Sequence, residues 1–141
     1  MGFVIRSDHG VFLAGAAGKI EHVKSALHAE TVACTEAIAG AGSFGANRVI
    51  FESDSQVLVS ALCSAEYDRS DFGVLVREAR SLCILNFDSF EFSFCRRVCN
   101  KVADAIAEHG YRTSLPAPAW AEHAPDFVSG LVISDLEARE V

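Results

Sequence analysis

The stretch NRVIFESDSQ, residues 47–56, predicts a strand that runs directly into a helix. Its first seven residues are rich in β-branched and aromatic side chains. Ser53 and Gln56 have the spacing of a capping box, with Ser53 as the N-cap. Asp54 lies in the turn between them, and sites in open α/β sheets gather at the carboxyl ends of strands. Asp54 is therefore either part of a helix cap, which is the commoner use, or a ligand.

The rest of the chain alternates between strand and helix patterns. Residues 2–6 and 11–15 are apolar runs joined by a polar turn, which predicts an antiparallel hairpin. Residues 89–95 alternate phenylalanine with polar side chains, as a half-exposed strand does. Helical periodicity covers residues 24–43, 55–64, 71–83 and 99–109, with glycine stops at Gly45 and Gly110. This order predicts an α/β fold, a mixed sheet with helices on its faces.

A chain of 141 residues has room for one domain. We predict a domain at residues 1–112 and an irregular, proline-containing tail at 113–141. The charged residues of the tail make it acidic: Glu122, Asp126, Asp135, Glu137, Arg139 and Glu140. The net charge of −7 argues mildly against a general nucleic-acid binder. A carboxylate-lined metal site would contribute to the same charge.

The sequence also predicts where the protein works. The sequence contains no run of about 18 uncharged apolar residues, which is the length that a membrane-spanning helix needs. The first residues also lack the apolar core of a secretory signal. The five cysteines are odd in number and have no paired spacing, which favours buried free thiols in a reducing compartment. We therefore expect an intracellular protein, in the cytoplasm or nucleus, that is neither secreted nor in a membrane.

Two further acidic residues stand out by position. Glu30 falls near the middle of the apolar arc of helix 24–43, and a lone buried carboxylate costs several kcal/mol unless it is paired or binds a metal. A glutamate at the edge of the arc, or one paired with a buried arginine, would show the same pattern. Asp104 falls on the polar side of the last helix, where the default is a solvated residue. Glu52 shares a strand face with Asp54 and is interpreted as a bystander.

The basic residues cluster at one place. Arg96 and Arg97 precede the last helix and Lys101 lies within it. Such a cluster is most often a solvated surface, and the functional alternative is contact with phosphate groups.

Together these features resemble one family, the reverse-transcriptase-like RNase H domain common in plant genomes. The resemblance runs from residue 2 to about residue 110, with order and spacing preserved. It is carried by the apolar hairpin, by Ala29-Glu30, by Glu52-Ser53-Asp54-Ser55 and by Arg96-Arg97-x-x-Asn100-x-x-Ala103-Asp104-x-x-Ala107. Trp120 and Pro125 are similar to the short extension that often follows this domain.

The resemblance implies a mixed five-stranded sheet flanked by helices. It also implies a chemistry, in which two Mg²⁺ ions, or Mn²⁺ in their place, are held by carboxylates and the RNA strand of an RNA–DNA hybrid is hydrolysed. Glu30, Asp54 and Asp104 fall on the second, third and fourth acidic positions of the family and would be catalytic metal ligands. Nucleic-acid contacts would come from Arg96, Arg97, Asn100 and Lys101. Nothing indicates a protein partner.

The sequence departs from the family pattern in two respects. The first acidic position lies on a strand before the hairpin, the central strand of the family sheet, and this chain begins inside the hairpin. The loop before the last helix reads Phe94-Cys95-Arg96, where the family usually has a histidine. We therefore expect weak or absent cleavage by this chain, and upstream residues outside it could supply the missing strand. The alternatives are a non-catalytic nucleic-acid-binding or interaction module derived from a retroelement, and a remnant that does not fold stably.

Overall fold

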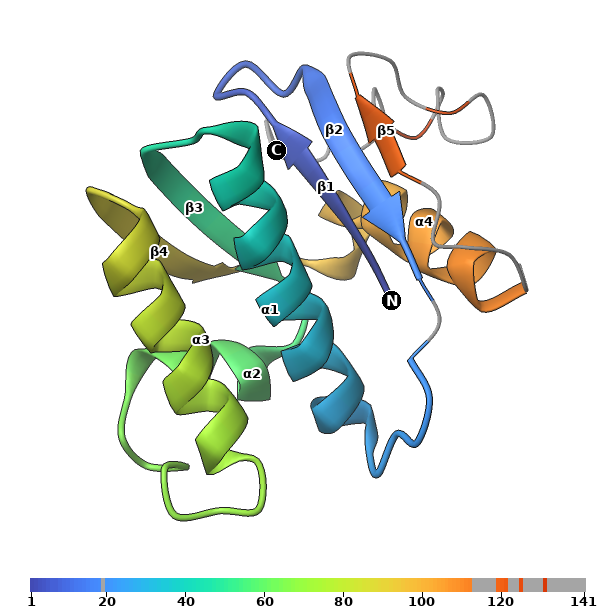
Figure 1. Ribbon diagram of the computed structural model, residues 1–141. Coiled ribbons are helices and arrows are strands. Elements are labelled where there is room, and N and C mark those ends of the chain that lie inside the picture. The colour runs from blue at the N-terminus through green and yellow to red at the C-terminus, as the bar shows by residue number, and fades with distance from the viewer. Residues whose placement is uncertain (19, 113–118, 122–124, 126–130, 132–141) are drawn as a thin grey trace. The chain divides into compact units, whose positions relative to one another are not determined.

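The computed structural model describes residues 1–18, 20–112, 119–121, 125 and 131. The predicted order of strands and helices is confirmed, with ends that differ by a few residues (Figure 1). The elements are β1 (Gly2–Arg6), β2 (Phe12–Ala17), α1 (Ala26–Phe44), β3 (Arg48–Ser53), α2 (Gln56–Cys63), α3 (Gly73–Asn86), β4 (Ser89–Phe94), a 3-10 turn (Arg97–Cys99), α4 (Lys101–Arg112) and β5 (Ala119–Ala121). They belong to two compact units. Unit 1 comprises Met1–Glu21 and Arg96–Val141, and unit 2 comprises His22–Cys95.

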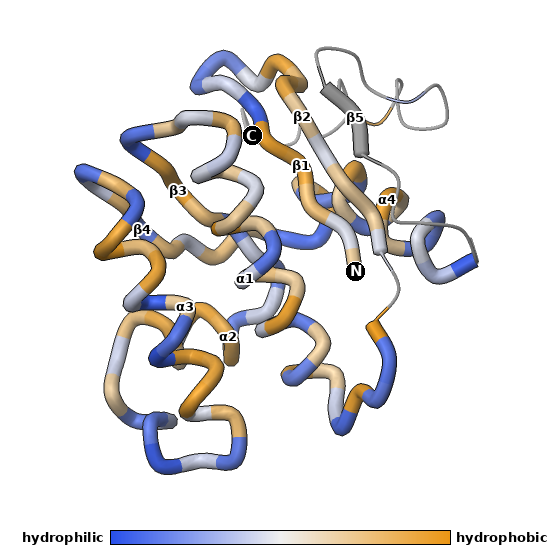
Figure 2. The backbone as a smooth tube through the Cα atoms, viewed as in Figure 1, coloured by the Kyte–Doolittle hydropathy of each residue, from blue (hydrophilic) through white to orange (hydrophobic). Residues whose placement is uncertain are grey.

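Unit 1 is a small antiparallel sheet packed against α4. β1 and β2 form the predicted hairpin, in which Val4 is paired with Gly15. The alternation between apolar strands and a hydrophilic turn is visible in Figure 2. The hairpin and α4 share a core of Phe12, Ala17, Val102 and Ile106. Burial of these side chains removes apolar surface from water, which is the main favourable contribution to the folding of such a unit.

The tail contributes a strand to unit 1. β5 pairs antiparallel with β2, with Ala14 opposite Ala121 and Ala16 opposite Ala119. Leu131, also in the tail, packs against the buried core of the unit. The sequence did not predict this strand. Apart from residues 119–121, 125 and 131, the predicted irregular tail lies outside the described residues.

Gly110 does not end the last helix, as the sequence predicted, because α4 continues to Arg112. A Cβ atom at Gly110 would lie 2.7 Å from the backbone nitrogen of Gly18, at the end of β2. Glycine is therefore present because the helix backbone passes close to another backbone, which is a use of glycine distinct from a helix stop.

Unit 2 is a parallel strand pair with three helices. β3 and β4 run parallel, with Arg48 opposite Ser89 and Ser53 opposite Phe94, and α2 and α3 form the connection that parallel strands require. The Phe51 ring packs against those of Phe87 and Phe92, with centroids 5.7 and 5.6 Å apart. The described strands thus form an antiparallel sheet, β1-β2-β5, and a parallel one, β3-β4, which confirms the mixed α/β class.

The ends of α1 follow from its sequence. Ser25 is the N-cap, and its side chain accepts a hydrogen bond from the His28 N–H group. Gly45 ends the helix with φ of 85°, a left-handed conformation that glycine adopts without steric cost. The predicted glycine stop at this position is confirmed.

The loop between α2 and α3 is fixed by one arginine and one glycine. Arg80 donates to the Ser64 carbonyl oxygen and forms an ion pair with Asp68. Gly73 begins α3 beneath this loop, where an added Cβ would overlap the Asp68 carbonyl group and lie 2.8 Å from the Tyr67 carbonyl oxygen. Both obstacles are backbone atoms, which cannot rotate away.

We therefore expect Gly73→Ala to lower the free energy of unfolding by about 2–3 kcal/mol, measured by urea denaturation. Gly42→Ala is the matched control. Its Cβ would meet Asn86 Oδ1 at an ordinary 3.7 Å, and alanine inside a helix is favoured over glycine by up to about 1 kcal/mol. Equal stability of the two variants would contradict the close packing at Gly73.

Candidate functional site

Asp54 lies between the end of β3 and the start of α2, as predicted. The capping residue is Ser55 and not Ser53, because the Ser55 side chain accepts from the Leu58 N–H group at 3.2 Å. Ser53 Oγ instead accepts from the Ser55 N–H group at 3.1 Å and stabilises the turn. The two serines thus supply the local hydrogen bonds of this turn, and the half-buried Asp54 is placed before the cap. The predicted capping box is therefore wrong, because the N-cap of α2 is Ser55.

Glu30 lies in the second turn of α1 and is half-buried. The fully buried residues of this helix are Thr31, Ile38 and Ala41, whose spacing places them on one face. Glu30 is therefore at the edge of the buried face. The sequence had placed it near the middle of that face, which is wrong. Thr31 was absent from the predicted arc because its hydroxyl is polar, but that hydroxyl donates to the Leu27 carbonyl oxygen at 2.7 Å and is satisfied within the helix.

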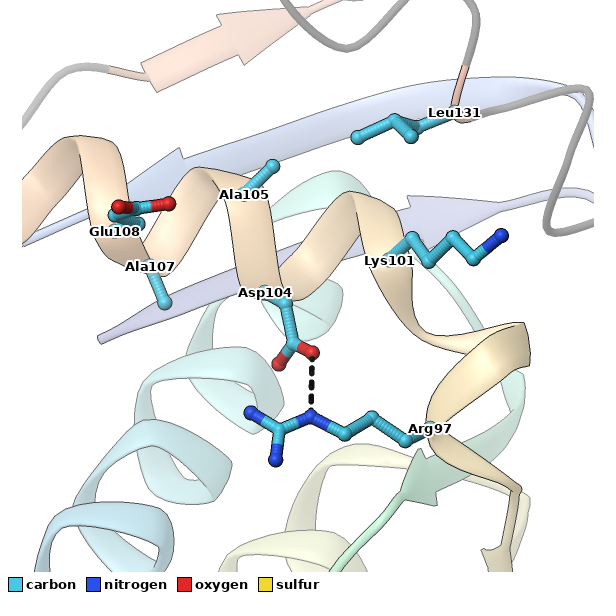
Figure 3. A pocket seen from close by; sticks show the side chains of 7 residues that line it. All are labelled: Arg97, Lys101, Asp104, Ala105, Ala107, Glu108 and Leu131. Atoms are coloured by element: carbon cyan, nitrogen blue, oxygen red, sulfur yellow. Dashed lines mark hydrogen bonds and ion pairs between the residues drawn. The ribbon is translucent and has the colours of Figure 1, made fainter.

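Asp104 lies in the first turn of α4 and forms an ion pair (Figure 3). Arg97 Nε donates to Asp104 Oδ2 at 3.3 Å, and the Asp104 side chain is 40% exposed. A carboxylate in the first turn is favoured by the positive end of the helix dipole. Asp104 is thus a half-buried carboxylate that is paired with a residue of the basic cluster.

The basic cluster surrounds the start of α4. Arg96, Arg97 and Lys101 are exposed and Asn100 is half-buried. Main-chain hydrogen bonds hold the turn, since the Cys99 N–H group donates to the Arg96 carbonyl at 2.8 Å and that of Asn100 to the Arg97 carbonyl at 3.0 Å. The four residues predicted to contact nucleic acid thus lie in one ordered turn and the helix that follows it.

An open pocket adjoins this cluster (Figure 3). It is lined by Arg97, Lys101, Asp104, Ala105, Ala107, Glu108 and Leu131. Sequence reasoning identified the first three of these residues and missed Glu108 and Leu131. Glu108 is paired with Arg112 one helical turn later, at 2.6 Å, so spacing along the helix could have drawn attention to it. Leu131 comes from the tail, for which the sequence offered no pattern.

The predicted metal ligands are divided between the two units. Glu30 and Asp54 belong to unit 2, and Asp104 belongs to unit 1. Within the described part of either unit, no three His, Cys, Asp or Glu residues form a group that could hold a metal ion. The chemistry of the three residues does fit a hard divalent cation, because all three are half-buried carboxylates with oxygen donors. Their convergence on one site stays a prediction.

The cysteines lie outside this candidate set. All five are free thiols. Cys83 and Cys99 are buried, as predicted for this group, whereas Cys63 is exposed. Burial raises the pKa of Cys34 to about 12, with a smaller contribution from nearby Cys83, and burial raises the pKa of Cys83 to about 11. These two thiols therefore stay protonated at neutral pH, which opposes a nucleophilic role.

The chain is similar to known proteins in sequence and in fold. The sequence profile of the reverse-transcriptase-like family matches residues 1–110. The structure is similar to the crystal structure of RNase H1 from the halophilic archaeon Halobacterium salinarum NRC-1, with a TM-score of 0.66 and 27% sequence identity. That match covers 77% of this chain and 82% of the archaeal one. The curated proteins contain no match to the chain. None of the described helices is long and apolar enough to cross a membrane.

Proposed function

Since the chain belongs to the reverse-transcriptase-like family of RNase H-like domains, we propose that it binds RNA–DNA hybrids and hydrolyses their RNA strand with two Mg²⁺ ions. The observation that carries the proposal is the position of Asp54 at the carboxyl end of β3, beside a helix that is capped by another residue. The likeness to a ribonuclease H1, at 27% identity, supports the same reaction.

The three carboxylates are suited to the metals that such a reaction uses. Glu30, Asp54 and Asp104 would hold Mg²⁺, or Mn²⁺ in its place, because hard cations prefer oxygen ligands. Bound divalent ions would activate water and stabilise the charge that develops on phosphate oxygens. The contribution of the chain is to present partly buried carboxylates from the ends of a strand and two helices, which restricts their motion before any ion binds.

The turn before α4 is suited to the phosphate backbone of the hybrid. The side chains of Arg96, Arg97 and Lys101 carry positive charge, and that of Asn100 carries both a donor and an acceptor. Such contacts position a nucleic acid without reading its sequence. A domain built in this way would recognise the hybrid by its backbone, in keeping with a nuclease that acts on many sequences.

The test is to incubate the purified chain with a labelled RNA–DNA hybrid, with Mg²⁺, Mn²⁺ or EDTA. We expect binding that weakens as salt rises and metal-dependent cleavage of the RNA strand alone. A duplex of DNA is the matched control substrate and should not be cut. Absence of hybrid binding at low salt would overturn the proposal.

A second candidate function is a non-catalytic nucleic-acid-binding module. The ion pair between Arg97 and Asp104 favours it, because a carboxylate that is paired with an arginine is not a metal ligand through the same oxygen. Hybrid binding of equal strength in Mg²⁺ and EDTA, with no cleavage over long incubation, would establish this function in place of the first.

A further inference from the structure

Arg97 lies in a turn that is held by main-chain hydrogen bonds, and its side chain is exposed. Its turn is anchored by the buried Cys99 and by the hydrogen bonds between Arg96, Cys99, Arg97 and Asn100. The Arg97 side chain, in contrast, is 81% exposed. The guanidinium group can therefore change partners through side-chain rotation alone, without movement of the turn or of α4.

One partner of Arg97 in this structure is a proposed metal ligand. Nε of Arg97 donates to Oδ2 of Asp104 across the start of α4 (Figure 3). The other carboxylate that lines this pocket, Glu108, is in an ion pair with Arg112 at 2.6 Å. Asp104 is thus the carboxylate for which Arg97 and a divalent cation would compete.

The ion pair is easily exchanged. Exposed ion pairs of this kind change the equilibrium constant of folding by only about a few-fold. A divalent cation can therefore displace the guanidinium group from Oδ2. Once displaced, Arg97 would be repelled by the cation and would lie beside Lys101 at the same open pocket. A phosphate group of the nucleic acid is then its natural partner, because guanidinium groups bind phosphate oxygens in a planar, bidentate manner.

We propose that Arg97 exchanges Asp104 for a nucleic-acid phosphate when a divalent cation binds Asp104, so that the metal and the hybrid each strengthen binding of the other. This inference rests on the proposed function and deepens it, since it assigns to Arg97 a coupling role between the two ligands. Coupling of this kind is reciprocal, so the factor by which the metal raises hybrid affinity equals the factor by which the hybrid raises metal affinity.

The experiment measures hybrid affinity of the full chain by fluorescence anisotropy, in EDTA and in saturating Ca²⁺, a hard cation of the same charge as Mg²⁺. For the wild type we expect the cation to tighten hybrid binding by about fivefold or more. Arg97→Gln should reduce this ratio to less than about twofold. It should also bind Ca²⁺ alone, in calorimetry without nucleic acid, at least as tightly as the wild type.

Lys101→Gln is the matched control for the loss of a positive charge. Lys101 lines the same pocket, but its side chain points away from Asp104 (Figure 3). This variant should bind the hybrid more weakly in EDTA and in Ca²⁺ alike, and should keep the wild-type ratio. A ratio that is preserved in Arg97→Gln, or lost equally in Lys101→Gln, would overturn the exchange.

A second pair of variants tests the same exchange from the side of the acid. Asp104→Asn removes the partner of Arg97 and should tighten hybrid binding in EDTA by about fivefold, with no further gain in Ca²⁺. Glu108→Gln removes the same charge from the same pocket and should change affinity less than about twofold. Equal effects of the two would overturn the exchange, whereas a wild type that binds neither hybrid nor cation would overturn the proposed function itself.

Discussion

Asp54→Asn is expected to lower the rate of metal-dependent cleavage of an RNA–DNA hybrid by about 100-fold or more. A metal ion at a phosphoryl centre contributes several kcal/mol to the stabilisation of the transition state, and each 1.36 kcal/mol corresponds to about tenfold in rate. The asparagine side chain keeps the size of aspartate but not its charge, so metal affinity should fall while the turn is preserved. Single-turnover cleavage with excess protein, together with calorimetric titration of Mn²⁺, measures both effects.

Glu52→Gln is the matched control for this prediction. Glu52 precedes Asp54 by two residues, lies in β3 and is exposed, whereas Asp54 is half-buried. The substitution removes the same charge without removing a proposed ligand. We expect cleavage within about threefold of the wild type, because exposed charges are screened by salt. Equal losses in the two variants would show that Asp54 acts through general charge and not through a bound metal.

Ile106→Ala is expected to lower the free energy of unfolding of unit 1 by about 2–5 kcal/mol. The Ile106 side chain is 0% exposed and belongs to the core with Phe12, Ala17 and Val102. Its truncation leaves a cavity that can close only if α4 and the hairpin shift towards each other. A small domain is stable by only about 5–15 kcal/mol, so the variant should unfold in unit 1 at a lower urea concentration than the wild type. The measurement is hydrogen exchange at the amides of β1 and β2.

Val98→Ala is the control for loss of apolar surface at the same end of the molecule. Val98 lies in the 3-10 turn before α4, and its side chain is 48% exposed. Its truncation should cost less than about 1 kcal/mol. Comparable losses in the two variants would contradict the core assigned to unit 1.

The order of the elements could be predicted because their local signals agree with the packing. The strand at residues 48–53 has a period of two, and α1 ends at a glycine in a left-handed conformation. Glycine is needed at position 110 for a different reason from that at Gly45, because the backbone of Gly18 approaches closely there. An approach between residues far apart in sequence has no local signal, and β5 was missed for the same reason.

The sequence predicted which residues belong to the candidate site, but not the hydrogen bonds and ion pairs that surround them. Asp54 was identified because the carboxyl end of a strand is marked in the sequence. The N-cap was assigned two residues too early, to Ser53 and not Ser55, because serine is a good N-cap at either position. The contact of Asp104 with Arg97 could not be predicted from helical periodicity. Arg97 lies in a 3-10 turn before α4, where the spacing of one helical turn does not apply.

Unit 1 is formed by two segments of the chain that are separated by the whole of unit 2. During synthesis the hairpin is made before α4, but an isolated hairpin is barely stable in water. Phe12 and Ala17 acquire their partners on α4 only after unit 2 has been made, and Ala14 pairs with Ala121 later still. The apolar side chains of the hairpin therefore stay exposed to water until the residues of α4 and β5 have been made, while unit 2 can already fold.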